Sequence, residues 1–159
     1  MHSKSFSISI NKRINPFKSI TKVDSDKSLS IRSFLIGSIS QNISTVRNVL
    51  ESEDVKSTIQ TCRKLGAKIK RVKPQSYVIH GKGLGSFFAK KNTSLNFGNS
   101  GTLARLLIGI LSTTPNIEVK IKGDHSLNKR SMKKLIELMK KFGAFFYPEK
   151  KYKFPLKMI

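Results

Sequence analysis

The chain has 159 residues, of which 31 are lysine or arginine and 9 are aspartate or glutamate, so its formal net charge at pH 7 is +22. This length and a hydrophobic content of 38% suit an ordinary globular domain with a core and exclude a disordered chain. The single cysteine, Cys62, excludes an intrachain disulfide and a zinc site built from several cysteines, and it favours a reducing compartment.

The predicted elements alternate between strands and helices along the chain, which indicates an α/β or α+β layered fold. In chain order they are a strand at 6–10, a helix at 28–40, a strand at 44–50, a helix at 53–67, a hairpin of 67–73 and 76–81, a helix over 103–111, a strand at 117–123, a helix at 132–142 and a strand at 144–148. The predicted core positions are Leu29, Phe34, Leu35 and Ile39; Val55, Ile59, Cys62 and Leu65; Leu103, Leu106, Leu107, Ile110 and Leu111; and Met132, Leu135, Ile136, Met139 and Phe142.

The second half of the chain repeats the order of elements in the first. Arg32 and Arg105 each precede an apolar stretch that contains a glycine, and Gly66 and Gly143 each follow an amphipathic helix. These pairs indicate two copies of a helix–strand–helix–strand repeat of roughly 75 residues. The last residues, "KYKFPLKMI", come where a second strand pair should follow, so we expect a truncated protein.

Membrane and nucleic-acid partners are both disfavoured by the sequence. The longest apolar stretch, 103–111, is too short to cross a bilayer and contains Arg105, and the N-terminus lacks the apolar centre of a secretory signal. We therefore expect a cytoplasmic protein, with a plastid location less expected. The lysines are scattered and no aromatic platform lies among them, although a basic nucleic-acid-binding module stays an alternative.

The stretch "GNSGTLAR" at 98–105 combines small residues with the start of an apolar helix. Asn99, Ser100 and Thr102 are helix-capping residue types, and Gly98 and Gly101 allow close backbone approach. Arg105 lies one turn beyond Thr102, away from the leucines. One interpretation is a capped core helix whose arginine reaches solvent. The other is an anion site at the helix N-terminus.

A similar arrangement stands at the corresponding place in the first half. Lys27 and Ser28 open the predicted helix, and Arg32 follows one turn beyond Ser28 on the same face. A third group of cations, Lys129 and Arg130, precedes the helix at 132–142, where ordinary solvated charge is the alternative. Two matching helix starts strengthen the anion-site interpretation of both.

Other candidate motifs are weak. The glycine-rich run at 81–85 lacks the third glycine of the dinucleotide fingerprint and no clear helix follows it, so it predicts a loop. His2, His80 and His125 show no metal-ligand spacing, so we expect no metal site. Cys62 falls on an apolar stripe, which predicts a core residue rather than a nucleophile.

Three segments resemble the signature motifs of the 5-enolpyruvylshikimate-3-phosphate synthase family. "DSDKSLSIR" at 24–32 resembles P-G-[SD]-K-S-hydrophobic-S-x-R, "GNSGTLAR" matches G-N-[SA]-G-T-x-x-R throughout, and "GDHSLNKRSM" at 123–132 resembles G-D-x-S/R-L-x-x-R-P-M. The resemblance covers nearly the whole chain. Two departures stand out: Asp24 and Ser25 replace the usual Pro-Gly, and Ser131 replaces the proline after the arginine.

The resemblance implies transfer of the enolpyruvyl group of phosphoenolpyruvate to the 5-hydroxyl of shikimate 3-phosphate, with release of phosphate, on the pathway to chorismate and the aromatic amino acids. It implies no metal and no organic cofactor. Motif matching implies that Lys27 is the catalytic residue and contacts both substrates. It implies that Ser28 and Arg32 bind shikimate 3-phosphate, and that Gly101 and Arg130 bind phosphoenolpyruvate. The supporting residues implied are Asn99, Thr102 and Arg105.

The family fold implied is two similar domains, each of three βαβαββ units, and the family enzyme is well over twice as long as this chain. The chain would hold two of the six units, at about 24–94 and 95–159, the second cut short. Residues 1–23 would pack with the missing C-terminal domain. Since that missing portion carries most of the family's proton-transfer acids, we expect the chain alone to bind poorly and not to turn over.

Two further alternatives stay open. The related UDP-N-acetylglucosamine enolpyruvyl transferases share the fold, but they prefer Lys-Asn at the first motif and have a reactive cysteine in a later loop. This chain has Lys27-Ser28, and its Cys62 lies within a predicted helix. A non-catalytic relic of the enzyme is the other alternative.

Overall fold

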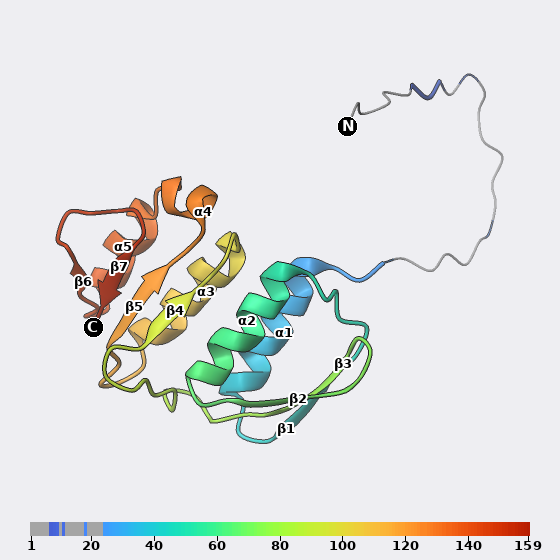
Figure 1. Ribbon diagram of the computed structural model, residues 1–159, viewed down its shortest axis with the longest axis horizontal. Coiled ribbons are helices and arrows are strands. Elements are labelled where there is room, and N and C mark those ends of the chain that lie inside the picture. The colour runs from blue at the N-terminus through green and yellow to red at the C-terminus, as the bar shows by residue number, and fades with distance from the viewer. Residues whose placement is uncertain (1–6, 10, 12–17, 19–23) are drawn as a thin grey trace.

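The computed structural model describes residues 7–9, 11, 18 and 24–159, and it shows two halves that each pack helices against a small sheet (Figure 1). Residues 7–9 are exposed and not in a strand, whereas residues 6 and 10 of the predicted strand lie outside the described residues. Most of the segment 1–23, which was expected to pack with a further domain, also lies outside them.

The first half contains two helices and a three-stranded antiparallel sheet. Its elements are α1 (Lys27–Ile39), β1 (Ile43–Val46), α2 (Glu53–Lys64), β2 (Lys68–Lys73) and β3 (Ser76–His80). The strand order is β1-β3-β2, and the predicted hairpin is the β2–β3 pair, which turns at Pro74 and Gln75. The predicted strand at 44–50 is shorter than expected and begins one residue earlier.

The second half contains three helices and a four-stranded mixed sheet. Its elements are β4 (Ser94–Asn96), α3 (Gly101–Ser112), β5 (Val119–Lys122), α4 (His125–Lys129), α5 (Lys133–Lys140), β6 (Phe146–Tyr147) and β7 (Leu156–Met158). The strand order is β4-β5-β7-β6, in which β4 runs parallel to β5 and the other neighbours are antiparallel. The α/β fold class is therefore confirmed, and this half has the order βαβαββ with α4 as an extra turn.

The two halves are copies of one arrangement. The order β1-β3-β2 in the first sheet matches β5-β7-β6 in the second. Gly66 and Gly143 both follow the second main helix of their half with positive φ values of 97° and 92°, a conformation that only glycine adopts cheaply. Phe34 and Leu107, which correspond in this alignment, are both fully buried. The predicted repeat is thus present in three dimensions.

The expectation that the chain ends before a second strand pair is wrong. Residues of "KYKFPLKMI" form β7, which pairs antiparallel with both β5 and β6. Sequence patterns missed β4, α4 and β7 because elements of three to five residues are too short to show a period. The unit boundaries near residues 24, 94 and 159 stay predictions.

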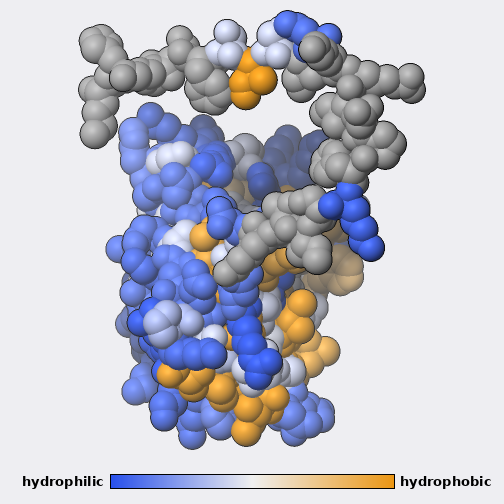
Figure 2. Space-filling view, turned by 90° about the vertical axis from the view of Figure 1, so that its right-hand side faces the viewer, coloured by the Kyte–Doolittle hydropathy of each residue, from blue (hydrophilic) through white to orange (hydrophobic). Residues whose placement is uncertain are grey.

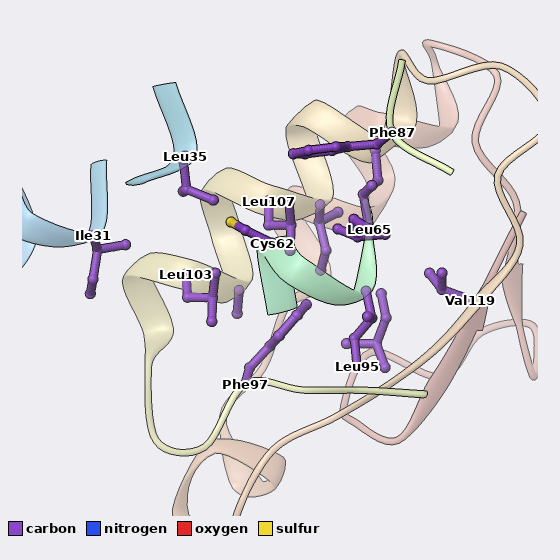
Figure 3. Close-up of a cluster of buried hydrophobic side chains, with 14 of the residues drawn as sticks. Ile31, Leu35, Cys62, Leu65, Phe87, Leu95, Phe97, Leu103, Leu107 and Val119 are labelled. Atoms are coloured by element: carbon purple, nitrogen blue, oxygen red, sulfur yellow. The ribbon is translucent and has the colours of Figure 1, made fainter. Parts of the chain in front are cut away.

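Side chains from α1, α2 and α3 meet with those of the strands in one buried core. Figure 3 shows Leu35, Cys62 and Leu107 lying close together within it. Cys62 is fully buried, and burial raises the pKa of its thiol to about 12, so the thiol stays protonated at neutral pH. The interpretation of Cys62 as a core residue is confirmed.

Three predicted core residues are instead exposed. Leu29, Leu106 and Phe142 are 62%, 40% and 63% exposed. The buried residues of α3 include Ala104 and Ile108 but not Leu106, and the helix contacts both α1 and α5. Apolar side chains interrupt a mainly hydrophilic surface on the side of the molecule shown in Figure 2. Among the helices described, none is long and apolar enough to cross a membrane.

A hydrogen-bonded cluster fixes the chain just before α2. The Glu51 carboxylate accepts hydrogen bonds from the Tyr77 hydroxyl at 2.6 Å and from two nitrogens of Arg71 at 2.9 and 2.8 Å. These bonds hold the pKa of Glu51 below its usual value, so the carboxylate is ionised at neutral pH. The start of α2 is therefore anchored to the β2–β3 hairpin.

Adjacent leucines of α3 offer a matched test of this packing. Leu107→Ala removes a fully buried side chain and should lower the free energy of unfolding by about 3 kcal/mol, whereas Leu106→Ala at a 40% exposed position should cost less than about 1 kcal/mol. Urea unfolding followed by circular dichroism measures both. Equal losses would contradict the burial pattern of α3.

Candidate anion-binding site

The start of α3 is built by short-range hydrogen bonds. The Ser100 hydroxyl caps the helix by accepting from the backbone N–H of Leu103 at 3.2 Å, and Ser100 is fully buried. The N–H groups of Gly101 and Thr102 occupy the first helical positions, where no carbonyl within the helix can accept from them. They therefore offer donors and a partial positive charge to an anion.

Arg130 reaches this helix start from the end of α4. Its Nη2 donates to Asn99 Oδ1 at 2.6 Å, and the backbone N–H of Asp124, the residue that caps α4, donates to the Gly98 carbonyl at 2.8 Å. A Cβ atom on Gly101 would lie 3.2 Å from Nη1 of Arg130 and 3.7 Å from Nη1 of Arg105. Both guanidinium groups thus lie beside the glycine.

Lys27 joins the same place from the first half of the chain. It is the first residue of α1, and its Nζ forms an ion pair with Asp54 Oδ2 of α2 at 3.0 Å. Contacts between α1 and α3 bring the two helices together. The site therefore draws its cations from both copies of the repeat.

These groups line one cavity of about 390 Å³, and almost all of its wall is polar. Its lining residues are Lys27, Asp54, Asn99, Gly101, Thr102, Arg105 and Arg130. In the part of the chain that the structure describes, neither Arg105 nor Arg130 forms an ion pair. Three cations facing one carboxylate leave a net positive charge, which suits a small anion with more than one acidic group.

The structure brings together six of the eight site residues suggested by the sequence. Ser28 and Arg32 lie on α1 but do not line the cavity, Ser28 being half-buried and Arg32 exposed. The sequence analysis did not single out Asp54, which lies in the first turn of α2. No group of three or more histidine, cysteine, aspartate or glutamate side chains that could hold a metal is found among the described residues.

The fold and the cavity together define an α/β repeat protein with a net positive cavity at a helix start. A family model described as EPSP synthase (3-phosphoshikimate 1-carboxyvinyltransferase) matches residues 11–158. The chain belongs to this family, as its three motifs indicated.

Individual relatives agree with the family match. The 3-phosphoshikimate 1-carboxyvinyltransferase of Petrotoga mobilis is 39% identical over 81% of this chain, and that of Syntrophomonas wolfei is 38% identical over 85%. A solved EPSP synthase from Acinetobacter baumannii superposes with a TM-score of 0.78 and 34% identity over 87% of the chain. The chain spans only 29%, 31% and 31% of these three proteins.

One departure from the family motif has a local replacement. Ser131 stands where the motif has proline, and its hydroxyl accepts a hydrogen bond from the backbone N–H of Lys133 at 3.4 Å, near the start of α5. A serine can thus stabilise the start of a helix through a side-chain hydrogen bond, whereas a proline stabilises it through its fixed φ angle. Asp24, at the other departure, is exposed and outside the cation-lined cavity.

Gly101 and Gly109 of α3 form a matched pair for testing the cavity. Gly101→Ala should weaken binding of inorganic phosphate by about threefold, roughly 0.7 kcal/mol, because the new methyl group pushes Arg130 aside. At Gly109 a Cβ atom meets nothing within 4 Å, so Gly109→Ala should leave phosphate binding unchanged. Titrations of the α3 amide resonances measure both affinities, and equal effects would contradict the assignment of this cavity.

Proposed function

We propose that this chain forms the phosphoenolpyruvate-binding side of a 3-phosphoshikimate 1-carboxyvinyltransferase. In the proposed reaction, the enolpyruvyl group of phosphoenolpyruvate passes to the 5-hydroxyl of shikimate 3-phosphate through a tetrahedral addition intermediate, and phosphate leaves. The observation that carries the proposal is the convergence of Lys27, Arg105 and Arg130 on the N-terminus of α3 in one cavity. The family membership supports it.

The cavity offers phosphoenolpyruvate a complementary set of donors. Two guanidinium groups can each bind a phosphate or a carboxylate in a bidentate manner, and the N–H groups of Gly101 and Thr102 add donors that need no reorganisation. The hydrogen bond from Arg130 to Asn99 fixes one guanidinium in advance. Groups held in place before binding lower the entropic cost of aligning the substrate.

The other substrate and the surroundings of the site are part of the same proposal. Lys27 would also contact shikimate 3-phosphate, with Ser28 and Arg32 further along α1, and no metal or organic cofactor would take part. The portion of the relatives that this chain does not span would complete the cleft. A cytoplasmic location belongs to this proposal as well.

An arginine pair tests the proposed role of the cavity. Arg130→Met should weaken binding of phosphoenolpyruvate by about tenfold, because a charge-assisted contact worth roughly 1.4 kcal/mol is lost. Arg47→Met is the control, since Arg47 is exposed and does not line the cavity. Isothermal titration calorimetry at low salt measures both. If Arg130→Met leaves the affinity for phosphoenolpyruvate unchanged, and the chain binds nucleic acid in a salt-sensitive way, the nucleic-acid-binding alternative is favoured.

The activity of the chain by itself is a separate prediction. The purified chain, given phosphoenolpyruvate and shikimate 3-phosphate together, should release no phosphate above the uncatalysed rate, because most of the family's proton-transfer acids lie outside it. A coupled phosphate assay measures this release, with a full-length relative as the positive control. Turnover by the 159 residues would show that they hold a complete set of catalytic groups.

A further inference from the structure

The ion pair between Lys27 and Asp54 lies in the wall of the cation-lined cavity. The Nζ and Oδ2 atoms are 3.0 Å apart, and the side chains are 49% and 16% exposed. Both residues line the cavity, and among the residues that the structure describes Asp54 is the only acidic one that does so. A carboxylate in an anion site repels the ligand, so its presence there calls for a function.

Lys27 is a cation of this site whose position depends on a partner. Its side chain has four flexible carbons, is half exposed and begins at the first residue of α1. An ammonium group on such a stem occupies many rotamers unless a partner fixes it. Arg130, in contrast, is already held by Asn99.

Asp54 is well placed to fix that ammonium. It lies in the first turn of α2, where the helix dipole favours a carboxylate, and the next residue, Val55, is 1% exposed in the core. The Thr58 hydroxyl donates to the Asp54 carbonyl at 2.9 Å, and the Glu51 cluster anchors the chain before the helix. The carboxylate therefore extends from a rigid backbone.

We propose that Asp54 is a positioning residue for Lys27. An ammonium group has three donors, so one can bind Asp54 while two remain for the anion in the cavity. Asp54 thereby sets the direction from which Lys27 approaches the ligand, and Lys27 contributes fully to anion binding only when this carboxylate is present. This inference rests on the function proposed above for the cavity.

Glu53 provides a matched control. It is adjacent to Asp54 in the same helical turn, its side chain is 86% exposed, and it pairs with Lys56 rather than with a residue of the cavity. Glu53→Gln therefore removes the same charge from the same helix terminus as Asp54→Asn, without touching Lys27. Asp54→Glu keeps the charge and is the conservative variant.

The first experiment needs no ligand. NMR relaxation measurements on the 159-residue protein should show that the Lys27 Cε is ordered. The Asp54→Asn substitution should lower the order parameter of this Cε to that of an exposed lysine such as Lys134. Glu53→Gln should leave the order unchanged, and Asp54→Glu should retain most of it. Backbone amide spectra confirm that each variant is folded. An order parameter unaffected by Asp54→Asn would overturn the proposal.

The second experiment is a double-mutant cycle on the binding of phosphoenolpyruvate. Lys27→Met should weaken binding by about tenfold when Asp54 is present, but by less than about threefold in the Asp54→Asn background. The cycle cancels the direct repulsion between Asp54 and the ligand. An equal or larger effect of Lys27→Met without Asp54 would mean that the carboxylate competes with the ligand for Lys27, and would overturn the proposal.

The two proposals can fail separately. If Arg130→Met has no effect on the binding of phosphoenolpyruvate, the proposed function of the cavity is wrong, whereas the relaxation experiment still decides whether Asp54 orders Lys27. If Arg130→Met weakens binding and the cycle shows no coupling between Lys27 and Asp54, only the positioning role is wrong.

Discussion

The capping hydrogen bond from Leu103 to the buried Ser100 hydroxyl is the interaction on which the rest of the site depends. It fixes where α3 begins, and a helix that begins at a fixed residue presents fixed faces. Leu103 and Leu107 then point into the core, while Gly101 and Arg105 face the cavity. A shift of one residue would rotate the helix by about 100° and exchange buried for exposed positions.

The repeat explains why the site lies between the two halves. Each half begins its first main helix with a polar turn, at Lys27 in one and at Gly101 in the other, and contacts between α1 and α3 bring these starts to one cavity. The two starts are not equivalent, however. The start of α3 offers free backbone N–H donors next to Gly101. The start of α1 offers the flexible ammonium group of Lys27, which is paired with the Asp54 carboxylate of α2. The repeated arrangement thus provides the framework, and different side chains at matching positions provide different chemical groups.

The sequence predicts those parts of the molecule that have long periods or dense motifs. The stripe of Val55, Ile59, Cys62 and Leu65 is buried as expected, and the motif at 98–105 correctly predicts a helix start beside cations. Strands of three residues such as β4 and β7 escape prediction because neighbours in the sheet, not local pattern, create them. Leu106 and Phe142 fit a helical period yet are exposed. The period of apolar residues shows which face of a helix is apolar, but it does not show whether another element packs against every part of that face. Asp54 was missed because its partner Lys27 is distant in sequence.

The net charge of +22 and the cation-lined cavity play different physical roles. Charges spread over a surface are screened within about 8 Å at physiological salt, so they attract anions of every kind and distinguish poorly among them. Selection needs donors whose positions are fixed before the ligand arrives. In this cavity the fixing comes from neutral or acidic groups: the Asn99 oxygen holds Arg130, the helix cap aims two N–H groups, and the Asp54 carboxylate holds Lys27. The carboxylate reduces the total positive charge of the cavity, but it also fixes the flexible Lys27 ammonium group. The loss of charge matters less in a protein whose surface already attracts anions.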